Sequence, residues 1–275
     1  MITLRRGIAL VLLALGALTA AMLWQAGADP VVRRLTVSVA GWPATAPPLR
    51  LVLISDIHVA GPETPPARLA RVVAQINALA PDLVLIAGDF VTEKRSASRL
   101  YGADAAIAPL AGLRARLGTV AVLGNHDHWL DTAAVHMALA RAKITVLDNR
   151  AVRVGPLAIG GVDDAFTHHA DLPATLADLA RVGGIPILLS HSPDIFPQVP
   201  ATVPLTLAGH THCGQIILPL YGPVATASRY GERYRCGVVR EGGKLLVVGA
   251  GIGTSILPFR LGAAPDLWVI ELSGK

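Results

Sequence analysis

Five short polar clusters in the sequence each follow an apolar run, and each carries side chains that bind metal ions or transfer protons. They are Asp56-Ile57-His58, Gly88-Asp89, Gly124-Asn125-His126-Asp127, Ser190-His191 and Gly209-His210-Thr211-His212. In the first and last clusters the two ligand-type residues are spaced i, i+2, so in an extended segment both side chains point to the same face. Imidazole, carboxylate and amide groups without a thiolate favour Mn, Fe or Zn over soft metals. The clusters therefore predict a metal site.

The number of ligand-type residues indicates two metal ions. Seven residues qualify, which is too many for a single tetrahedral ion: Asp56, His58, Asp89, Asn125, His191, His210 and His212. Two neighbouring ions need a shared carboxylate, and Asp89, which stands alone at the end of its run, is the economical choice. Glycine precedes Asp89, Asn125 and His210, and it permits the tight turns and close backbone approach that such a site needs.

The apolar runs before these clusters have the composition of buried strands. The first half alternates strand and helix patterns, which indicates a mostly parallel sheet with helices on its faces. Its strands are predicted at 49–54, 82–87 and 119–123, and its helices at 66–79, 104–117 and 132–142. The second half has short strand patterns with few helices, typical of a second sheet packed against the first. These strands are predicted at 144–147, 151–154, 157–161, 185–189, 205–208, 238–240, 245–248 and 267–272. Open α/β sheets bind ligands at the carboxyl ends of their strands, where all five clusters lie.

The composition excludes several classes of protein. The 275-residue chain is 52% hydrophobic and 16% charged, so it has enough apolar surface for one large α/β domain and is neither disordered nor fibrous. Its formal net charge is +5, and Arg5 and Arg6 supply two of these charges. The remaining charge is too small to argue for nucleic acid. Only 4% of the residues are aromatic, which also disfavours a stacking track for single strands.

An uncharged apolar segment runs from Gly7 to Trp24, long enough to cross the hydrocarbon core of a membrane. It is either a retained signal anchor or a signal peptide with a small-residue cleavage pattern ending at Ala28. The anchor is favoured because the run is longer than the usual hydrophobic region of a signal peptide. Arginine pairs flank the segment on both sides, so charge gives little guidance on orientation. We expect a single-pass cell-membrane protein whose main domain lies outside the cytoplasm.

The two cysteines, Cys213 and Cys236, allow at most one disulfide. A Cys213–Cys236 bond stays open for an oxidising compartment. We favour the alternative, in which both are unpaired small residues of the core.

The series of motifs resembles that of the calcineurin-like metallophosphoesterase superfamily, from about Leu49 to Leu272. The resemblance implies an α/β fold, a four-layer α/β/β/α sandwich with a binuclear metal centre. It assigns one metal to Asp56, His58, Asp89 and His212, and the other to Asp89, Asn125, His191 and His210. It makes His126 the general acid or phosphate stabiliser, with Asp127 orienting the imidazole ring.

Further motifs are similar to those of the small membrane-associated phosphodiesterase branch, of the YkuE and YaeI type. They are Gly209–Gln215, Gly251–Thr254, Pro258-x-Arg260 and Pro265, together with the N-terminal apolar segment. Cys213 departs from this pattern, because the branch usually carries glycine there. The expected organisation is a signal anchor or signal peptide over 1–28, a linker and first strand over 29–48, and a phosphoesterase domain over 49–275.

The predicted reaction is hydrolysis of a phosphodiester or pyrophosphate bond by a hydroxide that bridges two divalent metal ions, with Mn favoured over Fe and Zn. The N-terminal segment places this activity at a membrane surface, where a lipid or nucleotide-lipid headgroup would be a suitable substrate. The alternatives are a nuclease of the same fold and a non-catalytic metal-binding scaffold. We expect a monomer with no nucleic-acid partner.

Other residues have two interpretations each. Arg260 either contacts a substrate phosphate, because a guanidinium suits bidentate recognition, or forms a structural ion pair. His128 and Trp129 either line the substrate mouth or lie in a solvated turn. His168 and His169 form a cap over the site or an ordinary surface loop. The Pro- and Gly-rich stretch that contains Tyr221, Arg229 and Tyr230 is a possible lid.

Overall fold

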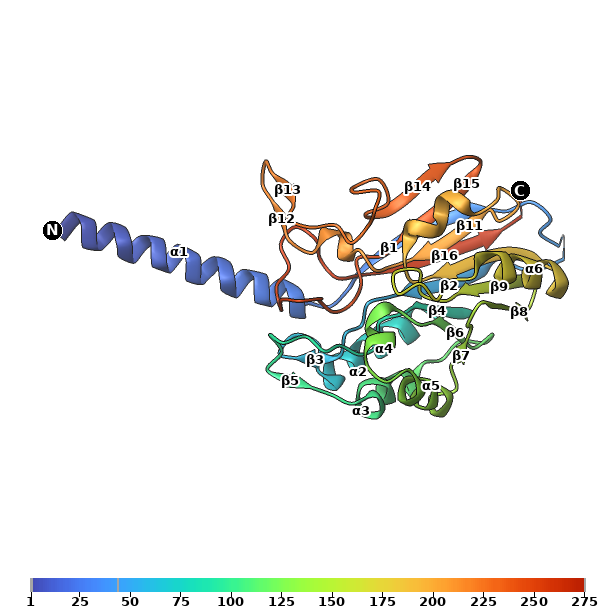
Figure 1. Ribbon diagram of the computed structural model, residues 1–275, viewed down its shortest axis with the longest axis horizontal. Helices are drawn as coiled ribbons and strands as arrows, with labels where there is room; N and C mark the ends of the chain where they lie inside the picture. The colour runs from blue at the N-terminus through green and yellow to red at the C-terminus, as the bar shows by residue number, and fades with distance from the viewer. Residues whose placement is uncertain (1, 44, 275) are drawn as a thin grey trace.

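Two facing β-sheets form the centre of the molecule in a computed structural model, which describes residues 2–43 and 45–274 (Figure 1). The strands of the first sheet are, in order, β1 (Val31–Ser38), β16 (Asp266–Ser273), β2 (Leu49–Ile54), β4 (Leu83–Ala87), β6 (Thr119–Val122) and β7 (Thr145–Val146). Those of the second are β14 (Gly237–Glu241), β15 (Lys244–Val248), β11 (Leu205–Ala208), β10 (Ile185–Ser190), β9 (Leu157–Val162) and β8 (Arg150–Val154).

The strands that precede the polar clusters run parallel within each sheet. β2, β4, β6 and β7 are parallel in the first sheet. β9, β10, β11 and β15 are parallel in the second. The antiparallel pairings lie outside these blocks, at β16 with β2, β8 with β9, and β14 with β15. The polar clusters therefore leave each sheet at a single edge.

Alternate residues of the strands build two cores on opposite faces of the first sheet. Leu51 and Leu53 of β2 pack between the sheets against residues such as Ile187 of β10. Val52 and Ile54 point outward to three helices: α2 (Pro66–Ala78), α3 (Ala103–Ile107) and α5 (Thr132–Arg141). On the outer face of the second sheet lies α6 (Leu172–Val182). The predicted four-layer α/β/β/α fold is confirmed.

Two helices differ from the sequence prediction. The helix predicted at 104–117 ends early: α3 gives way to a 3₁₀ segment, η1 (Ala108–Gly112), where Pro109 lacks the N–H of a regular helix. The helix α6 was missed because few helices were expected in the second half. Its start is marked in the sequence, since Asp171 caps the N–H of Ala174 and Pro173 occupies the first turn.

Several short elements lie around the site. β3 (Ala60–Gly61) pairs with β5 (Arg99–Leu100), and β12 (Ile217–Leu218) pairs with β13 (Gly222–Pro223) in a hairpin. The helix α4 (Asn125–Trp129) and the 3₁₀ turn η3 (His212–Gly214) begin within the polar clusters. A second 3₁₀ segment, η2 (Pro193–Gln198), follows β10.

The helix α1 (Ile2–Gly27) projects from one end of the domain (Figure 1). From Gly7 to Trp24 it carries no charged side chain, and this stretch is long enough to cross a membrane. The side chains from Leu4 to Ala21 are exposed. Its last turns contact the domain: Ala26 is buried, and the carbonyl of Met22 accepts a hydrogen bond from the backbone N–H of Arg260. Apolar side chains on every face are typical of a membrane or signal anchor.

Cys213 and Cys236 form a disulfide, so the interpretation as unpaired thiols is wrong. The chain between them makes the β12–β13 hairpin and then returns, which brings the two Cα atoms to 4.8 Å. The separation of 23 residues between the two cysteines did not indicate that the chain returns to the same place.

Candidate metal centre

The ends of five strands bring the seven predicted ligands together. Asp56 and His58 follow β2, Asp89 follows β4, and Asn125 opens α4 after β6. From the second sheet, His191 follows β10, and His210 and His212 follow β11. We call these seven residues the metal centre. None of their side chains is more than 6% exposed.

One half of the metal centre is formed by Asp56, His58 and His212. The Nε2 atoms of the two histidines are 3.1 Å apart. Nε2 of His212 lies 3.5 Å from Oδ1 of Asp56, and Nε2 of His58 lies 3.3 Å from Oδ2 of Asp89. Four ligand-type atoms thus surround one point.

The other half is formed by Asn125, His191 and His210. Nε2 of His191 lies 3.1 Å from Oδ1 of Asn125 and 3.0 Å from Nδ1 of His210. The same Nε2 atom is 3.3 Å from Oδ2 of Asp89. A single carboxylate oxygen of Asp89 is therefore equally close to both halves, as a bridging ligand must be.

The chemistry of these groups fits divalent cations. Nδ1 of His191 donates a hydrogen bond to the carbonyl of Ala87 at 2.7 Å, so Nε2 is the ring nitrogen that faces Asn125 and Asp89. Oxygen and imidazole nitrogen atoms at such spacing suit metals of the Mn, Fe and Zn type. The residues present therefore fit a metal pair.

The protonation states of three of the four histidines also suit metal binding. Burial lowers the pKa of His58 and of His212 well below the ordinary value, and it lowers the pKa of His210 to about 4. These rings are therefore neutral at neutral pH, as metal-binding imidazoles must be. Burial also opposes the charges of Asp89 and His191, but these two groups stabilise each other: His191 holds the pKa of Asp89 well below the usual range, and Asp89 raises the pKa of His191 well above its usual value. A cation bound there would displace the proton of His191. Asp89 is thus a carboxylate.

The backbone of the metal centre is strained. Five of the seven ligands have positive φ angles, which non-glycine residues rarely adopt: Asp56, His58, Asp89, His210 and His212. Each such conformation costs about 1–3 kcal/mol and persists only where the surroundings impose it. Hydrogen bonds do so here: the N–H of His210 donates to both carboxylate oxygens of Asp56 at 3.0 Å.

Two glycines allow the strand ends to approach each other. A Cβ atom on Gly124 would collide with the carboxylate of Asp89, and one on Gly209 would collide with that of Asp56. The predicted role of these glycines in close backbone approach is confirmed. Gly88 adds the left-handed turn, with a φ of +77°.

His126 lies beside the metal centre, and its imidazole is held by a residue that the sequence did not reveal. Nδ1 of His126 is 2.7 Å from a carboxylate oxygen of Glu93. An ionised carboxylate only accepts, so Nδ1 carries a proton and Nε2 is the ring nitrogen left for a substrate. Glu93 stands four residues after Asp89, outside the motif, and the sequence carries no periodic signal for it.

Asp127 does not orient the ring of His126, so that expectation is wrong. Its two carboxylate oxygens accept hydrogen bonds from the backbone N–H groups of four residues, Asp89, Phe90, Val91 and Gly124. A carboxylate committed to these donors fixes the turn after β4 against the start of α4. Asp127 therefore positions Asp89 and the backbone of His126.

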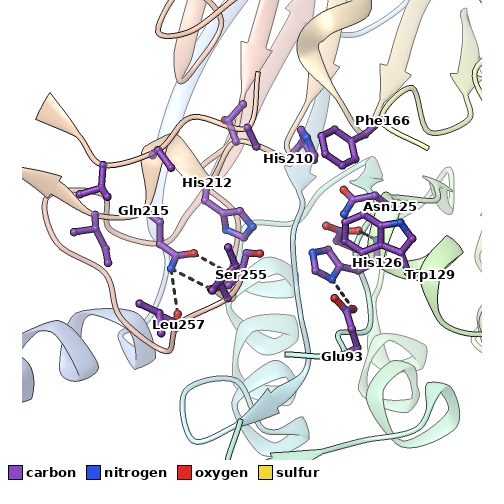
Figure 2. A pocket seen from close by; sticks show the side chains of 18 residues that line it. Glu93, Asn125, His126, Trp129, Phe166, His210, His212, Gln215, Ser255 and Leu257 are labelled. Carbon is purple, nitrogen blue, oxygen red and sulfur yellow. Dashed lines mark hydrogen bonds and ion pairs between the residues drawn. The ribbon is translucent and has the colours of Figure 1, made fainter. Parts of the chain in front are cut away.

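A cavity of about 380 Å³ opens above the metal centre (Figure 2). Asp89, Asn125, His126, His210 and His212 form its polar end. Trp129 and Phe166 stand over this end: the indole is 4.8 Å from the ring of His126, and Phe166 is 4.9 Å from that of His210. The remaining walls are largely apolar and come from residues 214–227 and 255–257.

The two other predicted substrate residues lie away from this cavity. Nε2 of His128 is 2.7 Å from Asp163, which raises the pKa of the imidazole, and the ring stacks on His169. Arg260 is fully buried. Its guanidinium donates to the carbonyls of Ala250, Gly253 and Ala263 and lies 3.3 Å from Nδ1 of His212, so it holds the loop behind that ligand.

Comparison with known proteins assigns this site to a family. The family model described as calcineurin-like phosphoesterase matches residues 49–214. The metallophosphoesterase YkuE of Bacillus subtilis is 33% identical, over 81% of this chain and 78% of that protein. The phosphodiesterase YaeI of Escherichia coli is 30% identical, over 82% and 83%.

A third relative is named as a transmembrane protein. It is the transmembrane protein with metallophosphoesterase domain of Danio rerio, 30% identical over 90% of this chain and 58% of its own length. Together with α1, this likeness indicates a membrane or signal anchor. The motif series, its assembly at the strand ends and these relatives lead to one conclusion: the chain belongs to the calcineurin-like phosphoesterases, a family of enzymes that use divalent metals.

Proposed function

We propose that this enzyme hydrolyses a phosphodiester or pyrophosphate bond with two divalent cations held in the metal centre. The observation that carries the proposal is the position of one oxygen, Oδ2 of Asp89, at 3.3 Å from both His58 and His191. One cation would be held by Asp56, His58, Asp89 and His212, and the other by Asp89, Asn125, His191 and His210. Manganese is the first metal to test, because the ligands are oxygen and imidazole nitrogen.

The bound cations would supply a hydrolytic nucleophile near neutral pH by lowering the pKa of water, and would neutralise phosphate oxygens during an in-line displacement. The protein's own contribution is to hold the ligands neutral or ionised as required and to fix their directions. The strained backbone at five ligands supports such preorganisation.

His126 is the general acid of the proposed reaction. Its Nε2 atom is available to the leaving oxygen because Nδ1 faces Glu93. The carboxylate of Glu93 stabilises the imidazolium that donates this proton and fixes the ring plane. Trp129 packs on the same ring and limits the access of bulk water.

The enzyme acts at a membrane surface in this proposal. The long apolar helix α1 supports attachment, and its contacts through Met22 and Ala26 keep the domain next to the point where the helix leaves the membrane. A retained helix would make α1 a single-pass anchor.

The test uses the full chain in detergent, stripped of metal by a chelator and then supplied with Mn²⁺. We expect hydrolysis of bis-p-nitrophenyl phosphate to return with the metal. Asp89→Asn should abolish both metal binding, measured by elemental analysis, and turnover. Asp104→Asn is the matched control, because Asp104 is an exposed carboxylate on α3. Absence of activity with every divalent metal would contradict the proposal.

A further inference from the structure

Large apolar side chains are exposed around the outer end of the cavity. They come from the turn of the β12–β13 hairpin and from the loop after Thr254. We call them the apolar rim: Leu218, Leu220, Tyr221, Ile256 and Leu257. Their exposed fractions run from 40% at Leu218 to 110% at Leu220. Exposed apolar residues gathered in one place mark a contact with a partner or a membrane.

The two segments of the apolar rim are joined into one unit by Gln215. Its side-chain amide donates to the carbonyls of Ser255 and Leu257 and accepts from the N–H of Ser255 (Figure 2). The backbone continues the link, because the N–H of Leu261 donates to the carbonyl of Gln215. Ile216 and Val224 at the base of the hairpin line the cavity, as do Ile256 and Leu257. The apolar rim is thus the outer margin of the cavity itself.

The same unit is attached to the end of α1. The backbone N–H of Arg260 donates to the carbonyl of Met22, and the side chain of Arg68 donates to the carbonyls of Ala28 and Ile252. Trp24, in the last turns of α1, is 76% exposed. In Figure 1 the β12–β13 hairpin lies at the end of the domain from which α1 projects. A membrane that holds α1 therefore faces the apolar rim.

Positive charge lies next to the apolar rim. The hydroxyl of Ser96 donates to the carbonyl of Ile256, which places the loop that carries Arg95 and Arg99 against the rim. Both arginines are exposed. Basic side chains beside exposed aromatic and aliphatic ones suit the interface of a membrane with anionic headgroups.

We propose that the apolar rim inserts into the membrane surface next to α1, so that the cavity opens onto lipid headgroups and the substrate is a phosphoester of a membrane lipid. The substrate part rests on the proposed function, whereas the insertion does not. The cavity has the matching polarity, with residues of the metal centre at its inner end and apolar walls leading outward to the rim.

The first experiment measures how deeply the apolar rim enters the membrane. The full chain is reconstituted in vesicles of phosphatidylcholine and phosphatidylglycerol, with an environment-sensitive fluorophore on Leu220→Cys. Met137→Cys is the matched control, because Met137 is 56% exposed on α5. We expect blue-shifted emission and quenching by nitroxide-labelled lipids at position 220 but not at 137. Equal, unquenched emission at the two positions would overturn the insertion. A blue shift without quenching would also overturn it, since a second copy of the chain would then cover the rim.

The second experiment compares the hydrolysis of two probes that release the same leaving group, one of them soluble and the other in the membrane. Bis-p-nitrophenyl phosphate is the soluble probe, and phosphatidyl-p-nitrophenol in the vesicles is the lipid probe. Replacing both Leu220 and Tyr221 by Asp should lower the rate on the lipid probe at least roughly tenfold, because a charged turn leaves the interface. The rate on the soluble probe should not change, and Met137→Asp should alter neither.

An unchanged rate on the lipid probe in the double variant would overturn the assignment of a lipid substrate. If the unaltered enzyme hydrolyses neither probe, the proposed function fails, while quenching at position 220 still decides whether the rim inserts.

Discussion

The metal centre and the apolar rim are two ends of one cavity, and they are built in opposite ways. The seven ligands are buried, leave central strands, and include five residues whose strained backbone is fixed by hydrogen bonds. The rim residues are exposed and stand on two turns joined chiefly through Gln215. In our proposals the buried end carries the chemistry and the exposed end controls access. Substitutions at the two ends should affect different measurements.

The largest effect is expected at the buried end, from His126→Ala. Removal of a general acid lowers turnover by about 10² to 10⁴-fold. The seven metal ligands remain, so the metal content of the protein should stay the same. Steady-state kinetics and elemental analysis test these two statements. Full activity on phosphodiesters with poor and good leaving groups would exclude His126 as the acid.

The next effect tests whether the metal centre tolerates change in its packing. In Gly124→Ala the new methyl group collides with the carboxylate of Asp89, and such overpacking costs about 1–3 kcal/mol of unfolding free energy. Weaker metal binding should accompany this loss. Gly102→Ala is the matched control, because among the described residues, its chain neighbours aside, no atom lies within 4 Å of its Cβ position. Urea unfolding measures the stability, and metal titration measures the affinity. Equal stability of the two variants would contradict the expectation that the metal centre tolerates no added side-chain volume.

A smaller effect is expected from Glu93→Gln. The amide keeps the shape of the side chain but loses the charge that stabilises the imidazolium of His126. We expect kcat to fall about tenfold, as for other residues that orient a functional group, with KM unchanged. Glu232→Gln is the control, since that side chain is largely exposed on the loop before β14. A rise in KM at constant kcat would instead make Glu93 a substrate-binding residue.

The smallest effect is expected at the apolar rim. Leu220→Ser removes an exposed side chain, and such surface changes stay within about 0.5 kcal/mol of the original stability. Thermal and urea unfolding in detergent should therefore coincide with those of the unaltered chain. A clear loss of stability would show that the rim is part of the folded core and would break the division between the two ends.

The metal centre was predictable because its signals are local. Each ligand stands directly after a short apolar run, and glycine marks the turns, so the type and place of Asp89 or His210 can be read without knowing the fold. The sandwich itself follows from the order of strand and helix patterns. The assignment of two strands was wrong, because those predicted at 144–147 and 267–272 join the first sheet and not the second. The proposed division of these residues between two metals comes from the resemblance.

The rest depends on segments that approach each other only in the folded chain. Glu93 meets His126 across a gap of 33 residues, and nothing near Glu93 in the sequence announces this contact. Arg260 has the composition of a phosphate-binding residue, yet the loop around it buries the guanidinium among carbonyl groups. The carboxylate of Asp127 follows His126 in sequence but turns to the backbone. Sequence adjacency was a poor guide to these side-chain partners.

The disulfide between Cys213 and Cys236 has a topological consequence for the hairpin. The bond closes a covalent ring of chain that contains both β12 and β13, and one end of the ring adjoins His212. In the chain-entropy model, closing a loop of this length raises the free energy of the unfolded chain by about 3 kcal/mol. The hairpin is therefore held at both ends by this bond. The bond thus keeps Leu218, Leu220 and Tyr221 within a short length of chain from His212 and the metal centre.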